Sequence, residues 1–541
     1  MAHVEDIKVP VEANAEPLSA QKAIIQEAQA AAEVEQELGL WKSIKLYPKA
    51  ICWSVLLSTA IIMEGYDLLL MGSFYALPPF QQRYGKQLAN GEFQIPAPWQ
   101  SGLSNGATVG SIFGLMLNGY VSERFGFRKT MLGALALICC LIFIPFFAPS
   151  LEVLLVGQIL MGIPWGIFQT LPTAYAAEVT PTHLRAYLTT YVNLCWVFGQ
   201  LLASGVLRAL LTRDDQWAYR IPFALQWVWP IPLIVGISMA PESPWWLVRQ
   251  NRLADAKAAL ARLTSHNAAG SVDLDKAVTL MVYTTEHEKE LGTGTSYLDC
   301  FRGVDLRRTI VACGCWLIQT LSGASFRTYS TYFYKQAGLP TDQAFNMSIG
   351  QYALGIVGVL MAWFLLPRAG RRTIYLLGLA CMMTLLIVIG ILGAVSNPPT
   401  TGVAWSVGSL LLVYTFFYDV SVGPVCYSLV SEIPSVRLRS KSIVLARASY
   451  NCLNIVTGVI TPYMLNPGAW NWGAKTGFFY GGTCVLSVLF TYFCIPEPKG
   501  RTFAELDILF HKKTPARMFA KTHVTLFETT ALDGQAGLEK E

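Results

Sequence analysis

Long apolar runs alternate with short polar connections along most of the chain. Each run is about as long as the 20 residues with which a helix crosses the hydrocarbon core of a bilayer. The runs cover residues 50–76, 102–121, 130–149, 151–175, 187–208, 221–240, 309–334, 347–366, 373–394, 403–430, 443–466 and 475–495. This pattern predicts an all-α membrane protein with twelve transmembrane helices in two six-helix halves.

The polar stretches between and around the runs predict the domain organisation. The longest one mixes acidic and basic residues, which predicts a cytosolic linker of short amphipathic helices. The first 49 residues are polar and acidic and contain no apolar core of a signal peptide. The predicted parts are an N-terminal tail over 1–49, a first half over 50–240, a linker over 241–308, a second half over 309–495 and a C-terminal tail over 496–541.

Lysine and arginine are unevenly distributed between the two sides of the predicted bundle. They cluster after the second, eighth and tenth spans, at residues 124–129, 368–372 and 437–441, and are nearly absent after the third, ninth and eleventh. Cytosolic loops carry such an excess of basic residues. Both termini are therefore expected in the cytosol, although Arg208, Arg213 and Arg220 after the fifth span depart from the rule.

The composition supports a membrane protein and narrows the function. Only 14% of the 541 residues are charged, against about 25% in soluble domains. The net charge of +5 does not suggest nucleic acid as a partner. The protein is expected to lie in the lipid bilayer and to act as a monomer. The 12 cysteines lie mostly in apolar runs, which indicates no disulfide framework. The sequence offers no metal-ligand cluster and no nucleophile–base set, so we expect neither a metal site nor an enzyme.

Three short motifs of the first half recur in the same order and at nearly constant separation in the second half. The pairs are Glu123–Arg128 with Pro367–Arg372, Glu178 and Arg185 with Glu432, Arg437 and Arg439, and Pro241–Ser243 with Pro496–Pro498. Such internal duplication, with a binding site between the halves near the midplane, is typical of secondary transporters.

Charged residues lie inside several of the predicted spans. Glu64 and Asp67 are three residues apart in the first span and share one helix face, while Arg327 and Asp419 lie in the seventh and tenth. A charge at this depth is costly unless it faces the protein interior or a water-filled path. These positions are therefore candidates for function.

The motifs together resemble the sugar porter family of the major facilitator superfamily. They are Gly65–Asp67, Glu123–Arg128, Glu178 with Arg185, Pro241–Pro244, Gly423–Pro424, Ser431–Pro434 and Pro496–Arg501. Three further stretches are similar to the fungal maltose permeases, or general α-glucoside:proton symporters: Gly157–Gly166, Asn193–Trp196 and Trp470–Phe479. The resemblance implies the major facilitator fold in the plasma membrane and uptake of α-glucosides such as maltose by alternating access. It also implies a proton as the coupling ion and no other cofactor.

The resemblance places the proton-coupling carboxylate at Asp67, the alternative being a structural carboxylate in a permanent ion pair. Glu64 is expected either to modulate Asp67 as a like-charged neighbour or to orient the helix. In many sugar porters the proton-coupling carboxylate faces an arginine on the fourth span, and this chain has Gln158 at that position. The maltose permeases have a further acidic residue on the second span, and this chain has Ser111 there. At a rise of about 1.5 Å per residue, Arg327 lies at the depth of Asp67. Arg327 is thus a candidate counter-ion of Asp67, the alternative being that it reaches the outer headgroups.

Asp419 lies closer to the cytosolic side on the same estimate and is expected to be a poor partner for Arg327. A direct sugar contact or a gating hydrogen bond is the expected role of Asp419, and it is also a candidate to compensate for Ser111.

A sugar requires neutral hydrogen-bonding groups and aromatic faces. The predicted contacts are Asn193, Gln319, Ser322, Ser325, Tyr427 and Asn454. The alternative is that these polar side chains only join one helix to another.

The charged residues of the repeated cytosolic motifs are expected to form ion pairs that latch the halves together in the outward-open state. They are Glu123, Arg124, Arg128, Glu178, Arg185, Arg371, Glu432, Arg437 and Arg439. The alternative is that the arginines only set the topology.

Two other functions remain open at this point. A sugar sensor of the same fold would bind the ligand and signal with little or no transport, and a passive facilitator would not need the membrane acids. The sequence also leaves open which sugar is carried.

Overall fold

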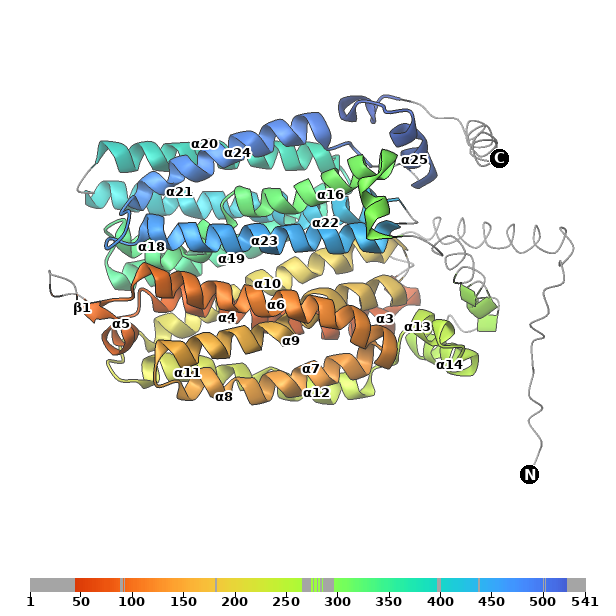
Figure 1. Cartoon of the computed structure of the whole chain (residues 1–541), viewed down its shortest axis with the longest axis horizontal. Coiled ribbons are helices and arrows are strands. Elements are labelled where there is room, and N and C mark those ends of the chain that lie inside the picture. The colour runs from red at the N-terminus through yellow and green to blue at the C-terminus, as the bar shows by residue number, and fades with distance from the viewer. Residues whose placement is uncertain are drawn as a thin grey trace, which may run out of the picture.

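The computed structural model describes residues 44–522. Short gaps fall at 88–90, 92, 181, 265–273, 276, 280, 283–284, 286–295, 397–399, 436–437, 500 and 502. The N-terminal tail up to residue 43, Arg437 and the chain after residue 522 lie outside the described residues, and so does part of the linker. Long helices run side by side in two groups, the first half of the chain below and the second half above (Figure 1).

The first half consists of six membrane-spanning elements, several of them built from two or more helices. They are α3 (Pro48–Ser58) with α4 (Ala60–Phe74), α6 (Ala97–Phe125), α7 (Phe127–Leu141) with α8 (Phe143–Phe147), α9 (Leu151–Val179), α10 (Thr182–Leu210), and α11 (Trp217–Leu225) with η1 (Gln226–Val228) and α12 (Pro230–Met239).

The second half repeats this plan. Its elements are α16 (Gly303–Leu321) with α17 (Ala324–Thr328) and α18 (Ser330–Gln336), α19 (Thr341–Leu365), α20 (Arg371–Val395), α21 (Thr401–Val420) with α22 (Val422–Glu432), α23 (Arg439–Leu465), and η4 (Gly473–Lys475) with α24 (Thr476–Cys494).

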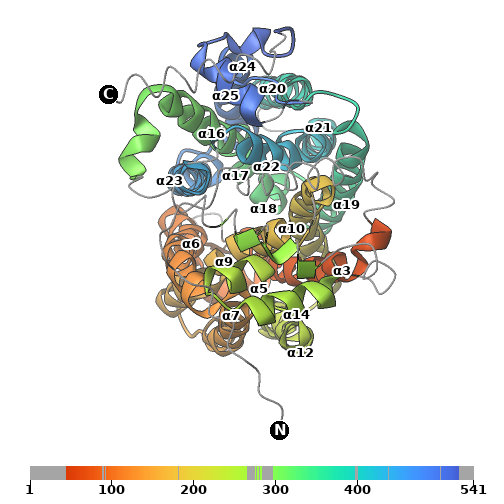
Figure 2. The same cartoon turned by 90° about the vertical axis from the view of Figure 1, so that its right-hand side faces the viewer.

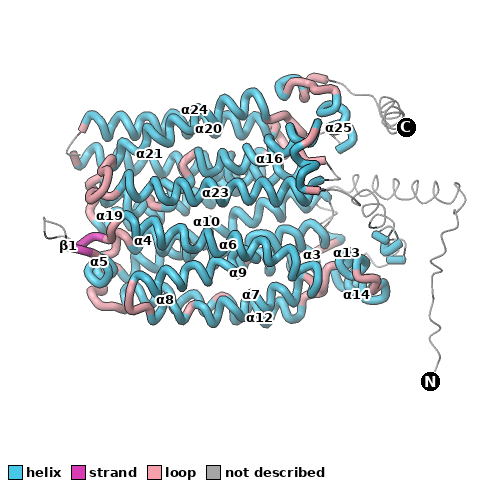
Figure 3. The backbone as a smooth tube through the Cα atoms, viewed as in Figure 1, coloured by secondary structure: helices cyan, strands magenta, loops and turns pink. Residues whose placement is uncertain are grey.

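The remaining elements lie at the two ends of the bundle (Figure 3). One end, called here the hairpin end, carries α5 (Pro78–Tyr84) and a two-stranded antiparallel hairpin in which β1 (Lys86–Gln87) pairs with β2 (Phe93–Gln94). The other, called the terminal end, carries α13 (Pro244–Arg249), α14 (Leu253–Leu263), η2 (Tyr297–Phe301), α25 (Phe503–His511) and η5 (Ala516–Met518). The helices α13, α14 and η2 belong to the expected linker.

Eleven of these elements are long and apolar enough to cross a membrane, and α6 is the twelfth by its place in the bundle. At 29 residues α6 is long enough, but its serine, asparagine, threonine and glycine residues lower its hydropathy. Those residues have a reason to be there: Ser104, Asn105 and Thr108 face the interior, and the glycines allow close packing.

Glycines bring α6 and α9 into close contact. A Cβ atom added at Gly162 would meet the carbonyl of Ala107 and lie 2.8 Å from the Cα of Gly110, and one added at Gly114 would meet the carbonyl of Ile163. Small residues at this spacing let two membrane helices approach until their backbones touch. The two helices therefore form one tightly joined pair.

Two spans of the second half are interrupted within the bundle. Gly323 adopts a left-handed conformation (φ +105°) between α16 and α17, and the chain bends again at Ser421 (φ −120°, ψ −85°) between α21 and α22. Such breaks in a membrane helix are tolerated where the backbone is buried in protein or lines a cavity. Seen from the terminal end, α17, α18 and α22 lie toward the centre between the two halves (Figure 2).

The repeated motifs have the same structural task in each half. The carboxylate of Glu242 accepts hydrogen bonds from the backbone N–H groups of Phe127 (2.9 Å) and Arg128 (3.2 Å) at the start of α7. The carboxylate of Glu497 accepts equivalent bonds from Arg371 (2.8 Å) and Arg372 (3.0 Å) at the start of α20. A carboxylate at a helix N-terminus satisfies free N–H groups and is favoured by the helix dipole. Burial raises the pKa of Glu242, and the backbone hydrogen bonds oppose that shift.

Several hydrogen bonds hold the two halves together at the hairpin end. Lys335 donates to Gln81 (3.1 Å), Asn466 to the carbonyl of Ile95 (3.0 Å), and Gln94 to Tyr332. Further from this end, Ser101 donates to the carbonyl of Val459 (3.1 Å) and Asn105 to that of Ile455 (3.2 Å). The hairpin end is therefore closed in this conformation.

Candidate functional site

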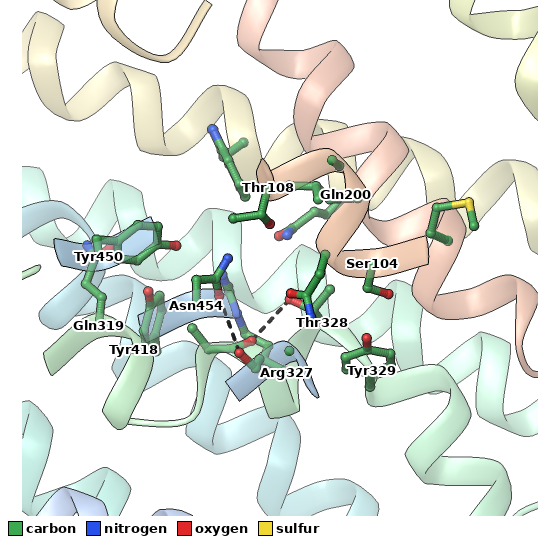
Figure 4. A pocket seen from close by; sticks show the side chains of 18 of the residues that line it. Ser104, Thr108, Gln200, Gln319, Arg327, Thr328, Tyr329, Tyr418, Tyr450 and Asn454 are labelled. Atoms are coloured by element: carbon green, nitrogen blue, oxygen red, sulfur yellow. Dashed lines mark hydrogen bonds between the residues drawn. The ribbon is translucent and has the colours of Figure 1, made fainter. Parts of the chain in front are cut away.

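A cavity of about 90 Å³ lies between the two halves, lined by residues of α4, α6, α9 and α10 on one side and of α16, α17 and α21 to α23 on the other. Figure 4 shows the labelled side chains of both halves converging on it, among them Thr108 and Gln200 of the first half and Gln319, Arg327 and Asn454 of the second. The site thus belongs to both halves, and its shape depends on how they are placed relative to one another.

Five of the six predicted sugar contacts line this cavity. They are Asn193, Gln319, Ser325, Tyr427 and Asn454. Gln319 donates to the carbonyls of Val422 (3.3 Å) and Gly423 (3.0 Å), while Ser325 bonds Thr457 (2.8 Å). Gln319 and Ser325 therefore line the cavity with side chains whose orientation is fixed by hydrogen bonds.

Ser322 does not line the cavity, so its place in the predicted set is wrong. It is fully buried, and its hydroxyl donates to the carbonyl of Gln319 (3.0 Å) at the end of α16. The helix break at Gly323 turns the chain directly after it. Ser322 therefore belongs to the end of α16 and not to the wall of the cavity.

Aromatic side chains surround the part of the cavity formed by the second half. Tyr418, Tyr427 and Tyr450 line it, and Trp316 packs edge-on against Tyr427 (5.0 Å between ring centroids) and Tyr450 (5.3 Å). Such rings next to amide side chains provide the apolar faces and the hydrogen-bonding groups that a sugar ring requires.

Arg447 of α23 is a cavity residue that the sequence analysis missed. Its guanidinium lies 4.4 Å from the ring centroid of Trp316 and 4.7 Å from that of Tyr450, and it donates to Oε1 of Gln169 (2.8 Å). Gln169 in turn donates to the buried carboxylate of Glu64. The three side chains form a hydrogen-bonded chain from the first half to the second. The signal was available, because Arg447 lies inside the predicted span 443–466.

Asp67 is fully buried, and an amide holds one of its two carboxyl oxygens. Gln226 Nε2 lies 2.5 Å from Oδ1, while Oδ2 has no hydrogen-bond partner among the described residues. Gln158, which stands where many sugar porters have an arginine, adjoins the carboxyl group. Ser111 is also buried, and its hydroxyl donates to the carbonyl of Thr108 (2.8 Å).

Arg327 pairs with Asp419 and not with Asp67. Nη1 of Arg327 lies 3.0 Å from Oδ2 of Asp419, and the guanidinium lies 4.5 Å from the ring centroid of Tyr418. Asp419 is fully buried and Arg327 is only 7% exposed, so the alternative that Arg327 reaches the headgroups is also wrong. The depth estimate failed because it assumed straight, continuous helices, whereas both spans are broken close to these residues.

The charged motifs at the terminal end form ion pairs, one between the first half and the linker and one within the second half. Glu178 pairs with Arg249 (2.8 Å), and Arg371 with Glu432 (3.2 Å). Arg124 donates to the hydroxyl of Tyr120 (2.8 Å). The carbonyl of Glu123 accepts from Trp246, and the side chains of Arg185 and Arg439 are not described. The predicted latch between the halves concerns another conformation and stays a prediction.

A bundle of two similar halves with a polar cavity and buried charges between them defines a membrane transport protein. The profile of the family described as "Sugar (and other) transporter" matches residues 53–510, and the chain belongs to this family. The predicted membership among the sugar porters, and a transporter rather than an enzyme, are thereby confirmed.

Relatives in yeast cover nearly the whole chain. The General alpha-glucoside permease of Saccharomyces cerevisiae is 44% identical over 497 residues, which are 91% of this chain and 80% of the relative. The Maltose permease MAL61 of the same species is 44% identical over 512 residues, 93% of this chain and 82% of the relative.

Solved structures show the same fold. The proton:xylose symporter XylE bound to 6-bromo-6-deoxy-D-glucose aligns with a TM-score of 0.70 at 23% identity, covering 86% of this chain and 100% of that one. The inward open conformation of XylE from E. coli aligns with a TM-score of 0.67 at 21% identity, covering 85% and 99%. The described residues have the major facilitator fold with six membrane-spanning elements in each half, as predicted.

Proposed function

We propose that this protein takes up α-glucosides such as maltose across the plasma membrane together with protons. The observation that carries the proposal is the 44% identity to a general α-glucoside permease and a maltose permease over more than nine tenths of the chain. The chemistry of the cavity supports it, because amides and aromatic rings of both halves line a space between buried carboxylates.

The proposal includes an orientation and a direction of opening. With the terminal end in the cytosol, as the positive-inside rule predicts, the hairpin end faces outward and its hydrogen bonds close the outer entrance. The conformation described here is then closed toward the outside. In the outward-open state the charged motifs at the terminal end would come together as the latch, and the bonds at the hairpin end would be broken.

Asp67 is the proposed proton site. It is buried, one of its oxygens has no partner among the described residues, and it adjoins Gln158, which lines the cavity. Burial favours the neutral form of a carboxyl group over the charged one. Glu64 is connected through Gln169 to Arg447, which would make the arrangement of the halves sensitive to the charge in the first span.

Uptake of radiolabelled maltose into yeast cells that lack their own α-glucoside permeases tests the proposal. We expect accumulation that an uncoupler abolishes and that Asp67→Asn reduces to equilibration. The exposed acid Asp342 offers a matched control, because Asp342→Asn removes a carboxylate outside the cavity. Uptake that ignores the uncoupler would exclude symport, and no uptake of any sugar by protein at the cell surface would favour the sensor.

A further inference from the structure

Gln158 of α9 is a buried amide that lines the cavity and makes no hydrogen bond of normal length and angle with any residue that the structure describes. Its side chain is fully buried, and neither Oε1 nor Nε2 is bonded to any described residue. Buried amide groups in proteins are nearly always paired, because an unpaired one keeps the cost of its lost hydration. The polar atoms of Gln158 are therefore available for groups that change during transport.

One such group is the carboxyl of Asp67. Gln158 adjoins it, and Oδ2 of Asp67 also has no partner among the described residues, whereas Oδ1 is occupied by Gln226. Asp67 is not among the described residues that line the cavity, and Gln158 is. A sugar in the cavity would thus meet Asp67 through Gln158.

We propose that Gln158 is a positioning residue that transmits the protonation state of Asp67 to the sugar by turning its amide group. A carboxylate only accepts hydrogen bonds, so it holds Nε2 of Gln158 and leaves Oε1 toward the cavity. A protonated carboxyl group donates, so Oε1 turns to it and the NH₂ group faces the cavity. The same wall position therefore changes from acceptor to donor when Asp67 takes up a proton.

The other charged groups around the cavity have partners of their own. Arg327 is paired with Asp419, and Arg447 is bonded to Gln169, which holds Glu64. On α4 itself the hydroxyl of Tyr66 donates to the carbonyl of Pro222 (3.1 Å). The cavity-lining tyrosines are Tyr329, Tyr418, Tyr427 and Tyr450. The amide of Gln158 is then the group that presents a different hydrogen-bonding atom to a bound sugar when Asp67 is protonated and when it is charged.

This inference rests on the proposed proton-coupled uptake. Coupling between two ligands is reciprocal, so a proton that strengthens sugar binding must be held more tightly when the sugar is bound. A hydrogen bond gained or lost at a charged or buried partner changes affinity about tenfold. The orientation of one amide is thus sufficient to produce a measurable coupling.

The test measures maltose binding to the purified protein in detergent as a function of pH, together with the protons taken up on binding in weakly buffered solution. In the unmodified protein we expect the dissociation constant to rise about tenfold as pH increases, with proton uptake on sugar binding. In Gln158→Met, which keeps the length of the side chain, we expect less than about a twofold change and little proton uptake.

Gln200→Met is the matched control, because Gln200 is another buried amide in the cavity wall, on α10. It is expected to weaken binding equally at all pH values and to leave the proton uptake intact. If Gln158→Met does not fold, Gln158→Asn shortens the amide and is expected to reduce the coupling in the same way. Full pH dependence in a folded Gln158 variant would overturn the inference. Failure of the unmodified protein to show uncoupler-sensitive uptake would instead overturn the proposed function.

Discussion

The ion pair between Arg327 and Asp419 lends itself to a quantitative test. In Asp419→Asn the shape of the side chain is kept, while the guanidinium of Arg327 stays buried without a counter-charge. The two charged atoms are 3.0 Å apart, and the side chains are 8% and 0% exposed. At this distance and an effective dielectric constant of about 20, the attraction is about 5.5 kcal/mol.

The expected loss of stability is smaller than the full attraction. The asparagine oxygen still accepts a hydrogen bond, and the ring of Tyr418, 4.5 Å from the guanidinium, still attracts the cation. Removing one partner of a buried pair costs about 3 to 5 kcal/mol, whereas removing both charges costs much less. We therefore expect Asp419→Asn and Arg327→Gln each to lower stability by about 3 kcal/mol and the double variant by clearly less than the sum.

The assay is thermal unfolding of the purified protein in detergent, with Asp342→Asn as an exposed control that should shift stability by less than about 0.5 kcal/mol. Both single variants are expected to lose their tertiary structure several degrees below the unmodified protein, and the double variant at an intermediate temperature. Strictly additive losses in the double variant would show that the two residues do not interact, and would refute the assignment of Asp419 as the partner of Arg327.

Four further predictions follow from the structure. Asp67→Asn is expected to abolish accumulation against a gradient while sugar exchange across the membrane continues, which counterflow in proteoliposomes measures; loss of both would indicate a structural role. Arg447→Gln is expected to reduce uptake at least about tenfold, because it leaves the buried carboxylate of Glu64 without a nearby positive charge. Adding Glu64→Gln to this variant is expected to restore part of the uptake, because the double variant has no unpaired buried charge. Gly162→Ala should lower stability by about 1 to 3 kcal/mol by forcing α6 and α9 apart, whereas Gly119→Ala, whose added methyl meets nothing within 4 Å, should not; equal effects in thermal unfolding would contradict the packing. Burial raises the pKa of Glu242, so this carboxyl group stays protonated to higher pH in the folded chain than in the unfolded chain. The unfolding temperature is therefore expected to fall as the pH rises above the ordinary carboxyl pKa, and a rise of that temperature in this interval would contradict the prediction.

The sequence was sufficient to predict the spans and the two halves, because both depend on local properties. Hydropathy over about 20 residues marks a span wherever it is high, and the repeated motifs mark equivalent ends of the halves. The structure gives these repeats a physical reason in Glu242 and Glu497, which cap the first turns of α7 and α20. Even α6, whose polar residues lower its hydropathy, was found from the length of its apolar run.

The details of the site depended on breaks that the apolar pattern does not reveal. The depth of Arg327 relative to Asp67 and Asp419 was calculated for straight helices, and the bends at Gly323 and Ser421 invalidate that calculation. Ser322, also predicted at the site, is instead buried at the end of α16, where its hydroxyl donates to the carbonyl of Gln319. Arg447 was not predicted, although it lies within the predicted span 443–466 and a basic residue is as costly there as an acidic one.

The hydrogen bonds at the hairpin end affect the rate of the proposed transport cycle. If the halves alternate as proposed, the bonds of Lys335, Asn466 and Gln94 across the interface are broken and remade once in every cycle. Each contributes about 1 kcal/mol, and each 1.4 kcal/mol added to a barrier slows a step about tenfold. Stronger hydrogen bonds at the hairpin end would therefore keep the outer entrance closed for longer and slow the transport cycle. Weaker bonds would speed the cycle and increase the fraction of time that the protein is open to the outside.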